Sequence, residues 1–291
     1  MITLQRHWPL FLGLALSLGL APAFAETSKF PPVPVYDSEV RSLTSTSSGQ
    51  EYSVLVTFPK DYATSGKTYP VLYVLDADIY VGMVTAVSRL LPLEGFFLGR
   101  QIVPELLIVG VGYPGGLREM AIERDRDLTP RADPAIDGSQ SFFRFLKEQL
   151  IPFVEATYRA DPSDRVLFGS STAGLFVLDT LLRHPGTFHR YVASSPRMGE
   201  VIFRLEADYA KEHDDLAGTV FLSAGTAGRI EQGIAKSVDR FFAALSGRKY
   251  RSLKLLHDSL TGESHVSAQP TALTRGLKAV FFEPAGLSPP P

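Results

Sequence analysis

The chain has 291 residues, of which 45% are hydrophobic, and 29 Lys and Arg stand against 31 Asp and Glu. This near balance of charge gives no sign of nucleic-acid binding or of an electrostatic membrane anchor. The sequence contains no cysteine, which excludes disulfides, thiolate metal sites and a cysteine nucleophile. A chain of this length can bury one large core, and no shift in composition asks for a second domain.

Residues 1–25 have the organisation of a secretory signal peptide. A short polar start is followed by an apolar stretch from Trp8 to Leu20, and Ala23-Phe24-Ala25 supplies a small-residue cleavage site. The apolar stretch is shorter than the roughly 20 residues that span a bilayer, so a retained anchor is the less favoured alternative. We therefore expect a periplasmic or secreted protein with no membrane insertion after cleavage.

The rest of the chain alternates between short apolar runs and amphipathic segments. Residues 26–48 are rich in Ser, Thr and Pro and are expected to form an extended N-terminal arm, and the Pro-rich residues 284–291 a disordered tail. Between them, residues 49–283 predict one α/β domain with a mostly parallel central sheet and helices on both faces. The predicted strands are Tyr52–Phe58, Val71–Leu75, Leu106–Val111, Val166–Phe168, Tyr191–Ala193, Val220–Leu222 and Leu253–His257. The predicted helices are Val81–Leu91, Ser141–Tyr158, Thr172–Arg183, Gln232–Leu245 and Thr271–Phe282.

The stretch from Pro114 to Gly138 interrupts this alternation. It is rich in charged residues, Pro and Gly. Such a long loop inside a compact domain is usually functional or disordered. The sequence Leu128-Thr129-Pro130 favours an ordered loop.

A candidate nucleophile follows the run Val166–Phe168. The small residues Gly169 to Gly174 come next, and a helical pattern begins directly after them. This is typical of the sharp strand–turn–helix corner that exposes a catalytic serine, and Ser171 has the G-x-S spacing after Gly169. The alternatives are a Gly/Ser-rich loop, or Ser171 serving only as the N-cap of the helix.

A serine nucleophile needs a general base, and His265 is the candidate. It lies in a loop of small residues between the last predicted strand and the last predicted helix, where an α/β-hydrolase carries its base. The other histidines after residue 25 are expected to be structural or solvated: His184, His189, His213 and His257.

The acid and the oxyanion hole complete the predicted site. Glu231 is the first carboxylate after the strand Val220–Leu222, whereas Asp239 should point elsewhere. Glu231 is equally compatible with a role at a helix N-terminus, in which case a Ser–His dyad would operate. The oxyanion donors should be the backbone N–H groups of Thr172 and Ala77.

The pattern resembles the esterase D-type serine hydrolases, which include feruloyl esterases, S-formylglutathione hydrolase and siderophore-ester hydrolases. Besides the corner at Ser171, three stretches carry the resemblance: Tyr69-Pro70-Val71-Leu72-Tyr73-Val74-Leu75-Asp76, Arg124-Asp125-Arg126-Asp127-Leu128-Thr129-Pro130 and Ser194-Ser195-Pro196. The similarity runs from about Leu43 to Phe282. It implies an α/β-hydrolase fold, serine-hydrolase chemistry on a small-molecule ester, and no metal or other cofactor.

Within that family, the arginine-flanked loop and the segment after Pro196 look most like the siderophore-esterase branch. The iron complexes that those enzymes act on are anionic, so Arg124, Arg126 and Arg197 are tentative substrate-binding residues. The alternative is that these arginines pair with nearby acids, namely Asp125, Asp127 and Glu200.

Three residues depart from the family pattern. Ser170 replaces a histidine, and Ala173 and Ala77 each replace a glycine; Ala77 could narrow or tilt the oxyanion hole. The leading interpretation is an exported serine esterase that works through an acyl-enzyme. The alternatives are an acyltransferase of the same fold and a non-catalytic binding protein that retains the fold.

Overall fold

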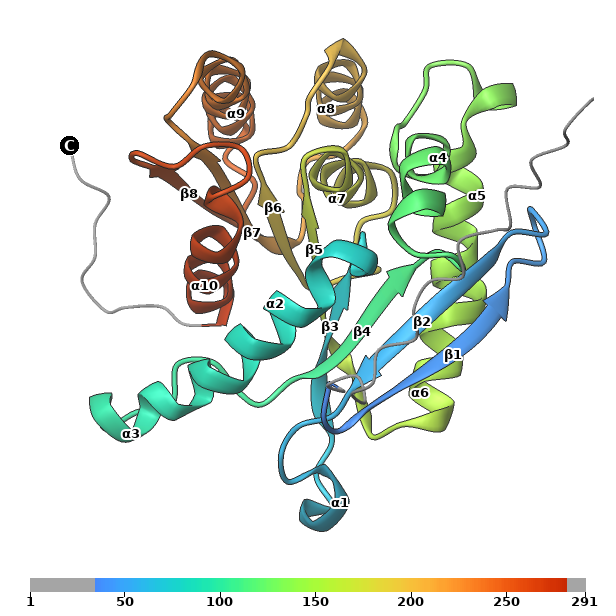
Figure 1. The fold of residues 1–291 in the computed structure, drawn as a ribbon. Helices are drawn as coiled ribbons and strands as arrows, with labels where there is room; N and C mark the ends of the chain where they lie inside the picture. Colours follow the sequence, from blue (N-terminus) through green and yellow to red (C-terminus); the bar gives the residue numbers. More distant parts are fainter. Residues whose placement is uncertain (1–34, 282–291) are drawn as a thin grey trace, which may run out of the picture. The chain divides into compact units, whose positions relative to one another are not determined.

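A computed structural model describes residues 35–281, which form one eight-stranded sheet with helices packed on it (Figure 1). The order of the strands across the sheet is β1-β2-β4-β3-β5-β6-β7-β8. The two strands β1 and β2 pair antiparallel, and β2 is antiparallel to β4, whereas all pairs from β4 to β8 are parallel. The bounds are β1 Ser38–Thr44, β2 Glu51–Thr57, β3 Tyr69–Val74, β4 Leu107–Gly112, β5 Ala160–Ser170, β6 Arg190–Ser194, β7 Gly218–Gly225 and β8 Leu253–Leu260.

The helices lie on both faces of the sheet, as the sequence predicts. One apolar cluster packs the helices α2 and α10 against one face of the sheet. A second cluster packs α5, α6, α7, α8 and α9 against the other face. The longer helices are α2 Ala77–Leu90, α4 Leu117–Leu128, α5 Gly138–Phe145, α6 Ile151–Thr157, α7 Thr172–Arg183, α8 Glu200–Glu212, α9 Arg229–Arg248 and α10 Ala268–Phe281. Short turns of helix are α1 Tyr62–Ser65, η1 Leu91–Leu93, α3 Glu94–Leu98, η2 Pro134–Ile136 and η3 Leu146–Leu150.

The central strands explain why the sequence signal for the sheet is strong. All six residues of β4 are buried, and five of the six in β3. Helices cover such parallel strands on both sides, so the strands read as continuous apolar runs. All seven predicted strands are present; their boundaries differ by at most three residues, except that β5 begins six residues earlier than predicted.

Two segments differ from the sequence prediction. Part of the expected arm over 26–48 is an edge strand, because β1 pairs along its whole length with β2, so the folded domain begins before residue 49. The expected loop from Pro114 to Gly138 contains the helix α4, which buries Met120 and Leu128. The predicted signal peptide and Pro-rich tail lie outside the described residues.

The predicted helix over Ser141–Tyr158 is divided into α5, the π-helical turn η3 and α6. Pro152 lies in the first turn of α6 and has no N–H to donate to a carbonyl of the preceding turn, which accounts for the break in the regular pattern. The chain continues as helix on both sides of this turn.

The segment Ala77–Leu98 is the one described helix that is long and apolar enough, by length and composition alone, to cross a membrane. Core helices of soluble domains have the same composition. In α2 the residues Val84, Thr85 and Ser88 are buried, and Val84 packs in the same apolar cluster as the sheet residues Leu72 and Ile108.

Candidate active site

Ser171 lies at a sharp corner between β5 and α7. Its backbone has φ 57° and ψ −117°, a strained conformation for a residue other than glycine. Two backbone hydrogen bonds hold the corner: the Ser171 N–H donates to the Ser194 carbonyl at 3.0 Å, and the Ser171 carbonyl accepts from the Arg197 N–H at 2.9 Å. The structure therefore has the corner that the small residues predict, and the segment after β6 helps to hold it.

The small residues around Ser171 have a steric reason. A Cβ on Gly169 would collide with the backbone carbonyl of Ala173, so only glycine fits there. A Cβ on Gly174 would lie 3.1 Å from Pro196 Cα, in the segment after β6. Ala173 itself is fully buried. The alanine that departs from the family pattern thus fits because Gly169 beside it has no side chain.

Glu231 and His265 form a hydrogen bond of 2.7 Å between Oε2 and Nδ1. Glu231 lies in the first turn of α9 and is 1% exposed, whereas the His265 side chain is about one third exposed. The other carboxylate oxygen of Glu231 accepts from the Gly225 N–H at 2.7 Å and from the Ser195 hydroxyl at 2.5 Å. A carboxylate held in this way favours a proton on His265 Nδ1 and leaves Nε2 free to take up a proton.

The two residues that hold Glu231, Gly225 and Ser195, have no predicted role in the sequence. Gly225 ends β7, and a Cβ there would collide with the Glu263 carbonyl in the loop that carries His265. Ser195 has φ 42° and lies directly after β6. The Ser194-Ser195-Pro196 stretch was a signal for this role, although its hydrogen-bond partner lies 36 positions further along the chain.

The remaining histidines lie elsewhere, as expected. His184 stacks on Phe143 with ring centroids 3.6 Å apart, and burial lowers its pKa to about 4. The ring of His213 stacks on Tyr209, and His189 accepts from a backbone N–H. His257 pairs at 3.4 Å with Asp239, which is therefore turned away from Glu231 and His265.

The two predicted oxyanion donors are each the first residue of a helix. Ala77 begins α2 and Thr172 begins α7, so neither N–H has a partner within its helix. Ala77 is fully buried, and a Cβ on Gly110 of β4 would lie 2.7 Å from the Ala77 methyl. The methyl of Ala77 therefore occupies space that Gly110 leaves beneath it.

The structure does not bring the three predicted arginines together as one anion site. Arg124 makes a two-pronged ion pair with Asp76, at 3.0 Å from Nε and 2.6 Å from one terminal nitrogen. Arg126 pairs with Asp127 at 2.7 Å and with Glu123. Both arginines are paired with acids: Arg126 with Asp127, which the alternative to substrate binding named, and Arg124 with Asp76, which it did not name.

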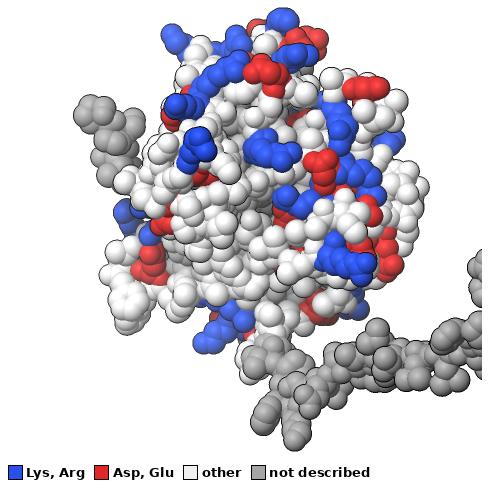
Figure 2. Space-filling view, turned by 45° about the horizontal axis from the view of Figure 1, so that its top comes forward, with Lys and Arg blue, Asp and Glu red and all other residues white. Residues whose placement is uncertain are grey.

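Arg197 differs from the other two arginines. Its side chain is 65% exposed and is 3.8 Å from its acidic partner, Asp125. Its backbone N–H bonds to Ser171, which places it beside the candidate nucleophile. The face in Figure 2 shows basic and acidic side chains interspersed around a broad uncharged area.

A recess of about 310 Å³ adjoins His265. Apart from His265 and Gln269, its walls are apolar or aromatic and come from α2 and from the segment that begins α10. They consist of Ile79, Tyr80, Met83, Val266 and Pro270. The recess lies next to His265 and has no Asp, Glu, Lys or Arg in its walls.

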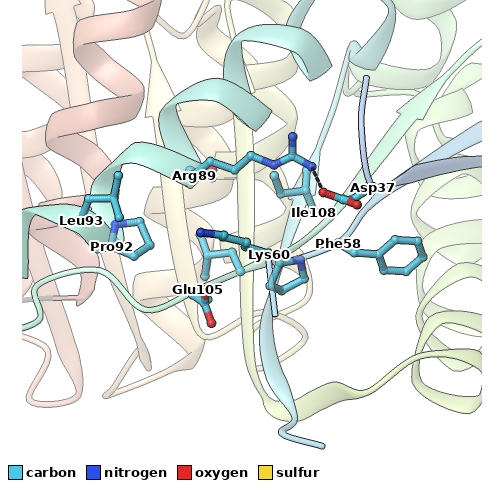
Figure 3. A pocket seen from close by; sticks show the side chains of 11 residues that line it. Asp37, Phe58, Lys60, Arg89, Pro92, Leu93, Glu105 and Ile108 are labelled. Atoms are coloured by element: carbon cyan, nitrogen blue, oxygen red, sulfur yellow. Dashed lines mark ion pairs between the residues drawn. The ribbon is translucent and has the colours of Figure 1, made fainter. Parts of the chain in front are cut away.

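A second cavity, of about 320 Å³, lies where β4 begins and β2 ends (Figure 3). Lys60, Arg89 and Glu105 line it, and Arg89 pairs with Asp37 at 3.5 Å. It contains neither Ser171 nor His265, whereas His265 lines the first recess, so we place the candidate chemistry beside that recess. Within residues 35–281, no three His, Asp or Glu side chains are grouped as metal ligands.

The known proteins that are similar to this chain are esterases. A model of the Esterase family matches residues 45–273. The chain is 27% identical over 263 residues to the ferri-bacillibactin esterase BesA of Bacillus subtilis (strain 168), covering 83% of this chain and 88% of that one. It is 30% identical over 289 residues to the siderophore triacetylfusarinine C esterase of Aspergillus fumigatus, covering 87% and 95%. The crystal structure of the BES protein from Bacillus cereus superposes with a TM-score of 0.77 at 25% identity, covering 88% of this chain and 100% of that one.

Proposed function

We propose that this chain, which belongs to the Esterase family, hydrolyses an ester bond of a siderophore with Ser171 as nucleophile, His265 as general base and Glu231 as the orienting acid. Members of this family are carboxylic ester hydrolases, and the chain is one of them. The 2.7 Å hydrogen bond between His265 and the buried Glu231 is the observation that carries the proposed mechanism.

In the proposed reaction, Ser171 Oγ attacks the ester carbonyl carbon while His265 Nε2 takes the hydroxyl proton. The carbonyl oxygen becomes an oxyanion that accepts from the N–H groups of Ala77 and Thr172. The C–O bond to the alcohol then breaks, the alcohol leaves with the proton from His265, and an acyl-serine remains. A water molecule repeats the sequence and releases the acid.

The proposed substrate class comes from the relatives, two of which are named as siderophore esterases. The recess beside His265 suits an apolar or aromatic part of such a molecule, because its walls carry little charge. Contact with an anionic iron complex would fall to Arg197, the most exposed of the three arginines.

We also propose that the enzyme is exported and acts in the periplasm or outside the cell. The support is the sequence of residues 1–25, an apolar stretch followed by a small-residue cleavage site. Such a location would give the enzyme direct access to siderophores outside the cytoplasm.

The decisive experiment combines a serine-directed probe with two neighbouring variants. A fluorophosphonate should label the wild type but not Ser171→Ala. That variant should lose at least about 10³-fold in kcat on p-nitrophenyl butyrate, because binding and oxyanion stabilisation alone would remain. Ser170→Ala, one residue away on a buried position of β5, is the matched control and should keep most activity.

The same preparations should then be tested on ferric and iron-free siderophores, with product analysis by mass spectrometry. Release of hydrolysed siderophore supports the substrate class, and activity on simple esters alone contradicts it. An unlabelled wild type would point to a non-catalytic binding protein. Ester products formed with added alcohols would point to acyl transfer.

A further inference from the structure

The ion pair between Arg124 and Asp76 connects two parts of the site that are far apart in sequence. Arg124 lies on α4, and Asp76 directly precedes Ala77, the first residue of α2. The Asp76 side chain is fully buried, while that of Arg124 is 23% exposed. A carboxylate buried to this extent is costly without a partner, so the guanidinium is its principal compensation.

The same guanidinium also reaches the second predicted oxyanion donor. Its remaining terminal nitrogen lies 3.4 Å from the hydroxyl of Thr172. Arg124 therefore contacts both the residue before Ala77 and the residue that follows Ser171. Arginine suits such a bridge because its planar group has several donors in a fixed arrangement, which lysine lacks.

The backbone at Asp76 gives this contact a geometric consequence. Asp76 has φ 53° and ψ 44°, a left-handed conformation that costs energy for any residue other than glycine. The ψ angle of Asp76 sets the direction of the peptide that carries the Ala77 N–H. Holding the carboxylate of Asp76 therefore helps to fix where that N–H points.

The other side of this turn is also held. Asp78 accepts from the Tyr113 N–H at 3.0 Å, and a Cβ on Gly112 would lie 2.6 Å from the Asp78 carboxylate. Gly110 and Gly112 of β4, and Tyr113 directly after it, thus support the turn from one side. Arg124 supports it from the other side and also contacts Thr172.

We propose that Arg124 is a positioning residue that sets the spacing of the two oxyanion donors by holding Asp76 and Thr172 at the same time. The inference rests on the proposed function, because the donors matter only if an oxyanion forms there. Preorganised donors need not move as the charge develops, so their spacing affects the transition state more than the bound ester.

The test measures kcat, KM and inhibition in the full-length enzyme carrying Arg124→Gln or Asp76→Asn. The inhibitor is an alkyl trifluoromethyl ketone, which reacts with serine to give a tetrahedral oxyanion in the same hole. Each variant should lower kcat on p-nitrophenyl butyrate by about 10- to 100-fold, less than the loss of a whole donor, with KM nearly unchanged. The inhibition constant should rise in proportion to the loss in kcat/KM.

Two further variants make the test specific. The double variant Asp76→Asn/Arg124→Gln should be no worse than the weaker single variant, because the two residues act through one contact. Thr172→Val keeps the shape of the side chain and removes only the hydroxyl, so it should give a smaller loss of the same kind. Arg118→Gln, an exposed position on the same helix, is the control and should match the wild type.

Three results would overturn the inference. An unchanged kcat with a lower melting temperature would make the ion pair purely structural. A higher KM at constant kcat would make Arg124 a substrate-binding residue after all. Independent, multiplying losses in the double variant would show that the two residues do not act together. A wild type that the fluorophosphonate fails to label would instead overturn the proposed function itself, and this inference with it.

Discussion

At the scale of single residues, the proposed chemistry depends on which atom of Glu231 faces His265. One oxygen is already occupied by the Gly225 N–H and the Ser195 hydroxyl, both of which donate, so the other is left for the imidazole. This arrangement favours a full triad over the Ser–His dyad that the sequence left open, and it makes the two mechanisms separable.

Glu231→Gln should lower kcat by on the order of 10²- to 10⁴-fold with little change in stability. The amide oxygen of Gln would take the place that accepts from Gly225 and Ser195, so its NH₂ would face His265 Nδ1. That donor favours the proton on Nε2, which is the wrong tautomer for a base. Steady-state kinetics, with Asp239→Asn as the control, distinguish the triad from the dyad. A loss in kcat below tenfold for Glu231→Gln would favour the dyad.

Arg197→Gln should raise KM for an anionic ester while leaving kcat and KM on a neutral ester nearly unchanged. The backbone N–H of Arg197 bonds to the Ser171 carbonyl, and its side chain is exposed and only loosely paired, so it is free to supply uniform binding to an anion. The effect should shrink at high salt, because exposed charges are screened.

Arg131→Gln is the matched control, since Arg131 shares the partner Asp125 at 3.0 Å. If Arg197 serves only that exposed pair, its loss is worth about 0–1 kcal/mol and both substrates behave alike. Equal kinetics of the two variants on the anionic ester would therefore count against a binding role.

How far the sequence predicts a residue depends on where its partner lies. The sequence predicts Ser171, Glu231 and His265 from their chain order and the residue types around them, and the structure joins Glu231 to His265 by a 2.7 Å hydrogen bond. For Arg124 the sequence leaves open an anionic substrate or a nearby acid, whereas its partner in the structure, Asp76, is 48 positions away. Such pairings depend on the three-dimensional packing of α4 against the sheet, which local sequence does not reveal.

At the scale of elements, the strand β1 and the helix α4 were not predicted, because the hydrophobic pattern of each is weak. The edge strand β1 has no buried residue, so it lacks the alternation that marks a strand. The helix α4 has one apolar side within a highly charged sequence. Its anchor is the buried Asp127, which accepts from the hydroxyls of Tyr52 and Tyr113.

The loop that carries His265 makes a further element-scale prediction. Gly225→Ala should abolish most activity and lower the melting temperature, because the new Cβ would collide with the Glu263 carbonyl and displace the segment that leads to His265. The same change at Gly233, a helical position with nothing within 4 Å, should preserve activity and leave stability equal or up to about 1 kcal/mol higher. Thermal unfolding and kinetics of both variants test this, and an active Gly225→Ala enzyme would contradict the packing.

At the scale of the whole molecule, the fold was predictable because its parallel strands are buried on both faces and its family motifs fall at their ends. The charge distribution is a different matter. The net charge of −2 says little about the site, where the side chain of Arg197 is exposed and the recess beside His265 has no Asp, Glu, Lys or Arg in its walls. Local arrangement therefore decides what the enzyme can bind, and the net charge does not.

Export is the last property of the whole chain that the sequence predicts. Cleavage after Ala25 should give a mature protein that begins at Glu26. Because Trp8 is the only tryptophan in the chain, the mature protein should contain none. Intact-mass spectrometry of the periplasmic or culture fraction tests the N-terminus at Glu26. The absence of tryptophan emission on excitation at long ultraviolet wavelengths tests the loss of Trp8.

The Ala25→Arg variant is the control. It should block cleavage and retain both the full mass and the tryptophan, because signal cleavage needs a small residue at that position. Wild-type protein that still contains Trp8 in the periplasmic or culture fraction would contradict the removal of residues 1–25 and would favour the retained anchor.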